Sequence, residues 1–157
     1  MITIRQEDFI QSIADALQFI SYYHPLDYIR ALGEAYAREE SPAAKDAMAQ
    51  ILVNSRMCAD GHRPICQDTG IVTVFLKIGM QVRWDTAGIG IEDMVNEGVR
   101  RAYLFPDNKL RASILADPAG KRKNTGDNTP AVGHMSLVPG DRGEVWVAAQ
   151  GEGCEKQ

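Results

Sequence analysis

Three consecutive residues, Cys66, Gln67 and Asp68, could do chemistry together. A cysteine thiolate binds iron or zinc, an aspartate carboxylate carries a proton or binds a hard cation, and a glutamine amide hydrogen-bonds a ligand oxygen. Gly70 lets the backbone turn sharply into the apolar run that follows. A strand-entry turn with a buried cysteine would explain the same residues without any function, because free cysteine is often buried.

Several separated blocks favour the functional explanation. The segment from Gly61 to Val74 resembles the iron-sulfur-binding segment of the class I, iron-sulfur-dependent fumarate hydratases. The other matching blocks follow in the order that this family shows, and they are Asn96 to Leu104, Asp107 to Arg111, and Asn124 to Ala131. The resemblance covers nearly the whole chain, from Glu7 to Gly153. Tartrate dehydratase, a close relative, shares the cluster segment, so the resemblance does not separate fumarate and malate from tartrate.

The resemblance implies a 4Fe-4S cluster with one iron left open for the substrate. Cys66 matches the first cysteine ligand, and the other two cysteine ligands are expected outside this chain. Gln67, Asp68 and Arg111 match residues at the substrate, and Gly153 matches the last glycine of a glycine-rich loop whose backbone approaches it. An arginine suits this role because its guanidinium binds a carboxylate through paired hydrogen bonds.

The implied reaction is the reversible hydration of fumarate to L-malate, a step of the tricarboxylic acid cycle. The open iron would act as a Lewis acid on the substrate. Asp68 is the catalytic candidate, as an acid or a base, and the second proton-transfer group is expected outside this chain. His24, His62 and His134 match no catalytic position of the family, and a lone histidine is more often structural.

The glycine-rich loop departs from the family pattern. The chain has Gln150, Glu152, Cys154 and Lys156 where the family segment Lys-Gly-Gly-Gly-Ser-Glu-Asn has lysine, glycine, serine and asparagine. Glu152 adds a negative charge that would repel a dicarboxylate. Since the family has serine in place of Cys154, we interpret that residue as a sequence change and not as a cluster ligand.

Length and composition predict a single domain over residues 1–157. The chain has 157 residues, of which 45% are hydrophobic, and this is enough for one packed core. Family members are considerably longer, so we expect an amino-terminal portion of the alpha-type domain, truncated, and inactive as an isolated chain. The family resemblance also implies a homodimer or a partner subunit.

Charge and cysteine usage exclude several classes of protein. The net charge of -4, with dispersed basic residues, argues against nucleic-acid binding. No apolar run approaches the length of a membrane span. Three cysteines, an odd number, and an acidic amino terminus without a signal peptide argue for a reducing compartment, which predicts a cytoplasmic protein.

Hydrophobic periodicity predicts an α+β fold, with amino-terminal helices followed by a mixed strand and helix region. Helices are expected over residues 9–20, 26–36 and 41–57, with Ser41 as a helix cap, and another over 91–102. The β-branched run 71–78 predicts a strand, and residues 117–130 a long loop. Residues 132–138 and 144–149 are expected to form a carboxyl-terminal hairpin across 139–143.

Two alternatives to the hydro-lyase stay open from sequence. The first is a non-catalytic truncated domain of the same family, which would give no brown chromophore with iron and sulfide. The second is an enzyme like the aspartic proteases, which also use an Asp-Thr-Gly triplet, here Asp68 to Gly70. Polar Gln67 before the triplet and the helical first third argue against the protease.

Overall fold

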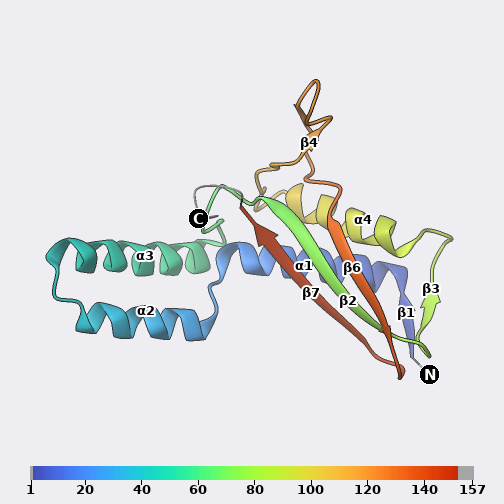
Figure 1. Cartoon of the computed structure of the whole chain (residues 1–157), viewed down its shortest axis with the longest axis horizontal. Coiled ribbons are helices and arrows are strands. Elements are labelled where there is room, and N and C mark those ends of the chain that lie inside the picture. The colour runs from blue at the N-terminus through green and yellow to red at the C-terminus, as the bar shows by residue number, and fades with distance from the viewer. Residues whose placement is uncertain (1, 152–157) are drawn as a thin grey trace. The chain divides into compact units, whose positions relative to one another are not determined.

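The computed structural model describes residues 2–151, which form two compact units (Figure 1). The sheet unit comprises residues 2–18 and 67–151, and the helical unit comprises Phe19–Cys66. The α+β class is confirmed, with helices first and the longer strands toward the carboxyl end. That the two units behave as one domain stays a prediction.

A three-stranded sheet with β2 in the centre organises the sheet unit. Strand β2 (Ile71–Gly79) runs parallel to β6 (Val132–Val138) on one side and antiparallel to β7 (Gly143–Gln150) on the other. One face of β2 is buried through Val72, Val74, Leu76 and Ile78, as alternation along a strand requires. The strand predicted over 71–78 is therefore confirmed.

The predicted carboxyl-terminal hairpin is wrong. Both strands form where expected, but β2 lies between β6 and β7. The connection from β6 to β7 crosses the end of β2 at Gly79, whose N–H donates to the Arg142 carbonyl at 2.8 Å. A Cβ atom at Gly79 would lie 2.4 Å from the Gly140 carbonyl oxygen, so only glycine lets the connection pass. Because β2 lies between β6 and β7, the backbone groups on both of its edges are paired. Next to a β6–β7 hairpin, β2 would have at most one paired edge.

Helices α1 (Gln6–Tyr22) and α4 (Ile91–Tyr103) supply the rest of this core (Figure 1). Their buried residues recur at helical spacing and include Phe9, Ile10, Ile13, Leu17, Met94, Val95, Val99 and Tyr103. The two helices are in close contact at Gly98, where a Cβ atom would lie 2.8 Å from Cβ and Cγ2 of Ile13. Gly98 therefore sets the distance between α1 and α4.

The Gly98→Ala variant is expected to be less stable than the wild type by about 1 to 3 kcal/mol, because overpacking outweighs the better helix propensity of alanine. Gly33→Ala in α2 is the matched control, since no atom lies within 4 Å of a Cβ there. The control should be neutral or gain up to about 1 kcal/mol. Urea unfolding of both variants measures this, and equal stabilities would contradict the close contact at Gly98.

The helical unit is an antiparallel pair of helices with little buried surface. Helix α2 (Leu26–Arg38) confirms the helix predicted over 26–36, and it contains no buried residue. Helix α3 (Pro42–Gly61) begins at the predicted cap, where the Ser41 side chain accepts from the Ala44 N–H. It runs past the expected end at residue 57 to Gly61, and His62 adopts the left-handed cap conformation with φ 47°.

Two short strand pairs were not predicted from sequence. Strand β1 (Thr3–Arg5) pairs in parallel with β3 (Arg83–Asp85). Strand β4 (Leu115–Ala116) pairs with β5 (Lys123–Asn124) at the start of the predicted loop (Figure 1). Strands of two or three residues are too short to show a period in the sequence.

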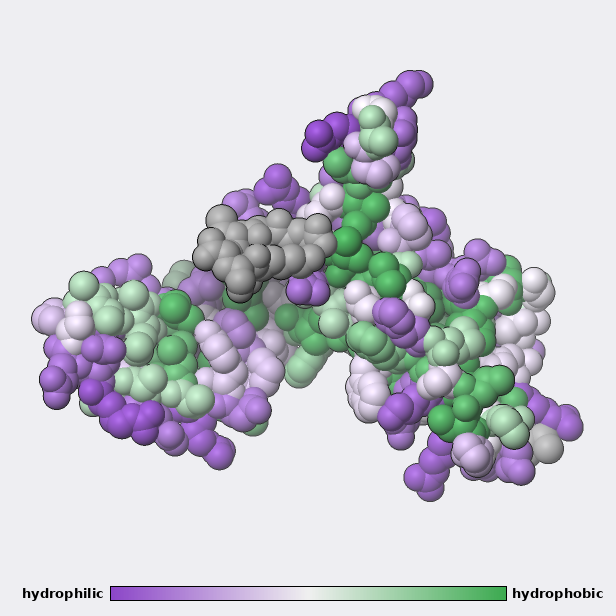
Figure 2. All heavy atoms as spheres, viewed as in Figure 1, coloured by the Kyte–Doolittle hydropathy of each residue, from purple (hydrophilic) through white to green (hydrophobic). Residues whose placement is uncertain are grey.

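The face of the sheet opposite the buried β2 side chains exposes aromatic residues. Phe75 is 43% and Trp146 is 54% exposed, and they are opposite each other in the β2–β7 register. The Lys77 ammonium lies 4.6 Å from the Trp146 ring centre, and His134 stacks on Phe75. Hydrophobic surface is visible over these strands in Figure 2. Among residues 2–151, no helix is long and apolar enough to span a membrane.

Candidate functional site

The turn from Gln67 to Gly70 lies against the end of β7. Gly70 has φ 59°, and a Cβ atom there would lie 1.6 Å from the Gln150 carbonyl oxygen. At Gly151, a Cβ atom would lie 3.2 Å from Cγ and Oδ2 of Asp68. Two glycines thus let the backbone at the end of β7 approach the turn, and they place the carboxylate of Asp68 beside the start of the glycine-rich segment.

Thr69 ties this turn to the segment that carries Arg111. The Thr69 hydroxyl donates to the Arg111 carbonyl oxygen at 2.5 Å. The Arg111 side chain is exposed and makes no hydrogen bond or ion pair within residues 2–151. Tyr103 is 1% exposed, and burial raises the pKa of its hydroxyl, while the neighbouring Thr69 offsets part of this rise. Tyr103 is therefore a protonated, neutral group beneath the turn at neutral pH.

A buried pair of amide side chains fixes the start of the Arg111 segment. Nε2 of Gln18 donates to the carbonyl oxygens of Ala102 at 2.6 Å and Asn108 at 2.9 Å. In return, Nδ2 of Asn108 donates to Oε1 of Gln18 at 2.8 Å. Leu110 is buried as well, while Arg111 after it is exposed. The block from Asp107 to Arg111 thus combines buried residues that hold the segment with an exposed guanidinium.

Asn128 joins three parts of the site, and sequence reasoning assigned it no role. Its side chain is fully buried, and its Oδ1 accepts from the N–H groups of Ser113 at 2.6 Å and Ile114 at 3.2 Å. Its Nδ2 donates to the Gly70 carbonyl oxygen at 2.9 Å. The available sequence signal was its place in a matching block within a long polar loop.

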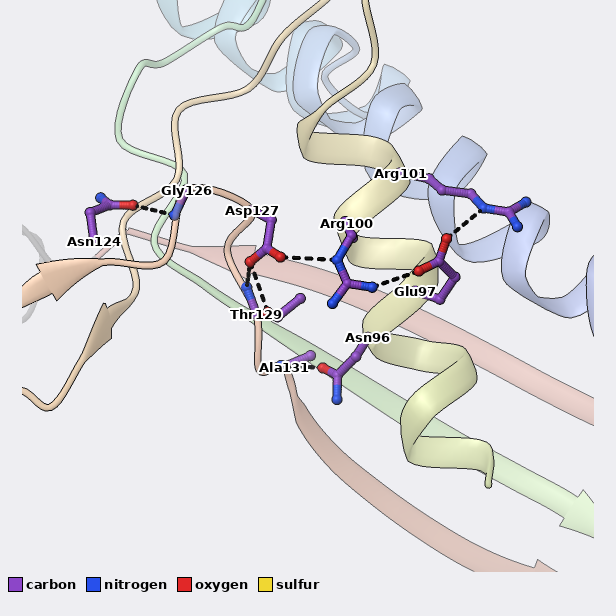
Figure 3. A network of polar contacts seen from close by, with 9 residues as sticks. All are labelled: Asn96, Glu97, Arg100, Arg101, Asn124, Gly126, Asp127, Thr129 and Ala131. Carbon is purple, nitrogen blue, oxygen red and sulfur yellow. Dashed lines mark hydrogen bonds and ion pairs between the residues drawn. The ribbon is translucent and has the colours of Figure 1, made fainter. Parts of the chain in front are cut away.

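A polar network holds the loop around Asn128 against α4 (Figure 3). Oδ1 of Asp127 accepts from the Thr129 N–H at 3.0 Å and from its hydroxyl at 2.8 Å. Oδ2 of Asp127 pairs with Nε of Arg100 at 3.0 Å, and Arg100 also pairs with Glu97 at 2.6 Å. Although burial raises the pKa of Asp127, the hydrogen bonds from Thr129 and Arg100 outweigh it, and the net pKa is lowered.

Acid should weaken this loop through Asp127. Because the folded pKa lies below the unfolded value, its stabilising contribution is complete above about pH 5 and is lost as the pH falls through the folded pKa. Asp127→Asn should therefore lower the free energy of unfolding by about 0.5 to 1 kcal/mol at pH 7, a modest value because Arg100 is partly exposed. Near about pH 2 the variant and the wild type should be equally stable. Urea unfolding across this range tests the prediction, and a pH-independent difference would contradict it.

Four of the five predicted site residues have exposed side chains, and the fifth lies outside the described range. Cys66, Gln67 and Asp68 all have exposed side chains, so the buried-cysteine explanation is wrong for Cys66. Cys66 is the last residue of the helical unit and is bonded to Gln67, the first residue after the boundary. Gly153, together with the changed positions Glu152, Cys154 and Lys156, lies outside residues 2–151.

The donor atoms fit one ligand of an iron-sulfur cluster. The Cys66 side chain is exposed, as a cluster ligand at a protein surface would be. Cys58 is buried at the end of α3, with its Sγ 3.7 Å from Oδ1 of Asn54, and it packs within the helical unit. Within residues 2–151, no group of three or more His, Cys, Asp or Glu side chains could hold a metal ion. A cluster on Cys66 thus needs cysteines from elsewhere.

The histidines have structural contacts, in line with the sequence expectation. His24 lies 3.0 Å from the Ser55 hydroxyl, and burial lowers the pKa of His24. His62 caps α3 and stacks on Tyr22. His134 stacks on Phe75 in the sheet.

The chain matches the family described as Fumarate hydratase (Fumerase) over residues 10–157. It belongs to this family of hydro-lyases. An Escherichia coli protein named "Fumarate hydratase class I, anaerobic" is 36% identical over 115 residues, which are 73% of this chain and 20% of that protein. A Methanocaldococcus jannaschii protein with the provisional name L(+)-tartrate dehydratase subunit alpha is 34% identical over 122 residues, 76% of this chain and 42% of the relative.

An Escherichia coli L(+)-tartrate dehydratase subunit alpha is 28% identical over 142 residues, 90% of this chain and 46% of that subunit. The chain therefore spans less than half the length of these relatives. Family membership and the α+β fold argue against the aspartic-protease alternative. The fumarate hydratase family accounts for the Asp68 triplet without it.

Proposed function

We propose that this chain is the amino-terminal part of a hydro-lyase that interconverts fumarate and L-malate. The observation that carries the proposal is the assembly of the Gln67 to Gly70 turn with the Arg111 segment and the Gly151 backbone. The Asp68 carboxylate, the Gln67 amide and the Arg111 guanidinium are all exposed side chains of this one compact unit. These groups suit a small hydroxy-dicarboxylate, which needs a cation for a carboxylate and a proton-transfer group near its reacting carbon.

Each residue has a distinct role in the proposed site. Arg111 binds one substrate carboxylate through paired hydrogen bonds. The Gln67 amide hydrogen-bonds a substrate oxygen without changing charge. Asp68 exchanges the proton on the carbon next to the hydroxyl-bearing carbon, as an acid in hydration or a base in dehydration. The Gly151 backbone leaves room for substrate next to Asp68, because glycine carries no side chain.

Cys66 would be one thiolate ligand of the family's 4Fe-4S cluster. When bound, such a cluster supplies a Lewis-acid iron to the substrate. Since thiolates must stay reduced to hold a cluster, we propose a reducing compartment such as the cytoplasm. The remaining cysteine ligands and Gly153 belong to parts of the site that residues 2–151 do not include.

The exposed sheet face supports assembly with further polypeptide. Phe75 and Trp146 expose large apolar surfaces, and β6 and β7 each have one edge that is not paired within residues 2–151. Exposed apolar patches and open sheet edges are typical of surfaces that another chain covers. Relatives named as alpha subunits fit this arrangement. We propose that a homodimer or a partner subunit completes the enzyme.

Substrate identity can be tested by comparing malate with L(+)-tartrate. The chain would be produced anaerobically together with the polypeptide that supplies the other cysteines, and turnover of both substrates would be measured. We expect a higher kcat/KM for malate. Arg111→Met should raise KM by about tenfold to a hundredfold, because a charge-assisted pair is lost. Faster turnover of tartrate would reassign the substrate, and an unchanged KM would remove Arg111 from the site.

A non-catalytic domain of the same family is the second candidate. The incomplete set of metal donors within residues 2–151 favours it. It predicts a cooperatively folded protein that gains no iron-sulfur absorbance and consumes no fumarate, even with the complementing polypeptide present. Such a result would replace the enzyme proposal.

A further inference from the structure

The two halves of the proposed site approach each other from segments far apart in sequence. Asp68 lies on the turn before β2, and Arg111 lies on the segment after α4. A dicarboxylate can use both residues only if their separation is fixed, because catalysis depends on the reacting groups holding one geometry. The side chains of Asp68 and Arg111 are both exposed, so their separation depends on how the two backbone segments that carry them are held.

We infer that Asn128 is the positioning residue that sets the spacing between Asp68 and Arg111, an inference that rests on the proposed function. Its buried side chain binds both segments at once. Its carbonyl oxygen holds the chain at Ser113 and Ile114, just after Arg111, and its amide nitrogen holds the Gly70 carbonyl, just after Asp68. An asparagine can do this because one side-chain amide carries an acceptor and a donor.

The geometry of Asn128 explains why another residue would fit poorly. Its φ is 63°, a region that asparagine, aspartate and glycine occupy most readily. Aspartate would keep both acceptor bonds but lose the donor to Gly70. Glycine would keep the backbone conformation but lose all three bonds. The two variants therefore separate the bridge from the backbone turn that carries it.

Asn96→Ala is the matched control. Oδ1 of Asn96 accepts from the Ala131 N–H at 2.9 Å, so it holds the same loop to α4 (Figure 3). Among residues 2–151, Asn96 makes no hydrogen bond to the Gly70 turn or to the Ser113 segment. Loss of Asn96 should lower stability without changing the spacing of the site.

The first arm of the test uses the chain as it is, by NMR. In Asn128→Gly, the Ser113 and Ile114 amide protons should shift upfield, and nuclear Overhauser contacts between Thr69 and Arg111 should be lost. In Asn128→Asp, the two amides should stay near their wild-type shifts, while the Gly70 carbonyl carbon shifts. Asn96→Ala should retain the Thr69 to Arg111 contacts. Contacts that persist in a folded Asn128→Gly protein would overturn the inference.

The second arm uses the assembled enzyme and separates KM from kcat. Asn128→Gly should raise KM for malate at least about tenfold and lower kcat, and Asn128→Asp should recover part of the loss. Asn96→Ala should leave KM within about twofold even where its melting temperature falls equally. A wild-type KM in Asn128→Gly, or an equal rise in Asn96→Ala, would contradict the positioning role. If the wild type shows no turnover, the proposed function fails and the NMR arm alone decides the role of Asn128.

Discussion

The Gly70→Ala variant is expected to lose the site and about 3 kcal/mol or more of folding stability. Its Cβ atom would lie 1.6 Å from the Gln150 carbonyl oxygen, 2.1 Å from the Gln150 carbonyl carbon and 2.4 Å from the Gly151 nitrogen. All three atoms belong to the backbone, so no side-chain rotation can relieve the overlap. Either β7 separates from the turn or the turn moves, and both changes displace Asp68.

Gly126→Ala is the matched control for Gly70. Gly126 also has a positive φ, 81°, but no atom lies within 4 Å of a Cβ there. Replacing it by alanine should lower the folding stability by only about 1 kcal/mol, because the sole penalty is that alanine must adopt a positive φ. Urea unfolding gives both values, and NMR of the Asp68 and Gly151 amides reports on the site. Equal stability losses in the two variants would show that β7 does not press on the turn.

Asp68→Asn is expected to lower kcat of the assembled enzyme by about 10² to 10⁴, because a proton-transfer group is lost while the amide keeps nearly the same shape. KM should change much less, since Arg111 and Gln67 still bind the substrate. The absorbance of the cluster should be unchanged, because Asp68 is not a proposed ligand. Initial rates in both directions and the visible spectrum measure these quantities.

Asp15→Asn serves as the control for charge, because Asp15 is exposed on α1, is distant from the turn in sequence, and accepts a hydrogen bond from the Gln11 side chain. It should keep wild-type turnover. If Asp68→Asn retained more than about a tenth of the wild-type kcat, the acid or base role would have to move to another residue. If it lost the cluster absorbance, its effect would be on cluster assembly.

Much of the fold could be predicted because its signals are local. Periodic apolar residues gave α1 and α4, and the pair Ser41 and Pro42 gave the start of α3. Pairing was not predictable in the same way. Strands β6 and β7 looked like a hairpin because only a short connection separates them, but the contact of Gly79 with Gly140 that lets them flank β2 is long-range.

The site could be predicted only in part, for the same reason. Cys66, Gln67, Asp68 and Arg111 were found through resemblance, and the structure places the last three within one unit. The supporting contacts join residues distant in sequence, such as Asn128 to Gly70, and no local pattern marks them. The helix predicted over 26–36 forms as α2 but contains no buried residue, because amphipathic spacing indicates a face to be covered and does not supply its partner.

The central claim is that Cys66 carries a catalytic cluster for hydration of a small dicarboxylate. The most direct measurement is to sequence the coding DNA past Gln157, produce the chain anaerobically with the complementing polypeptide, and record iron-sulfur absorbance and malate turnover in wild type and Cys66→Ser. We predict that the wild type shows both and that Cys66→Ser loses both. A wild type without either signal, or a Cys66→Ser variant that keeps both, would contradict the account.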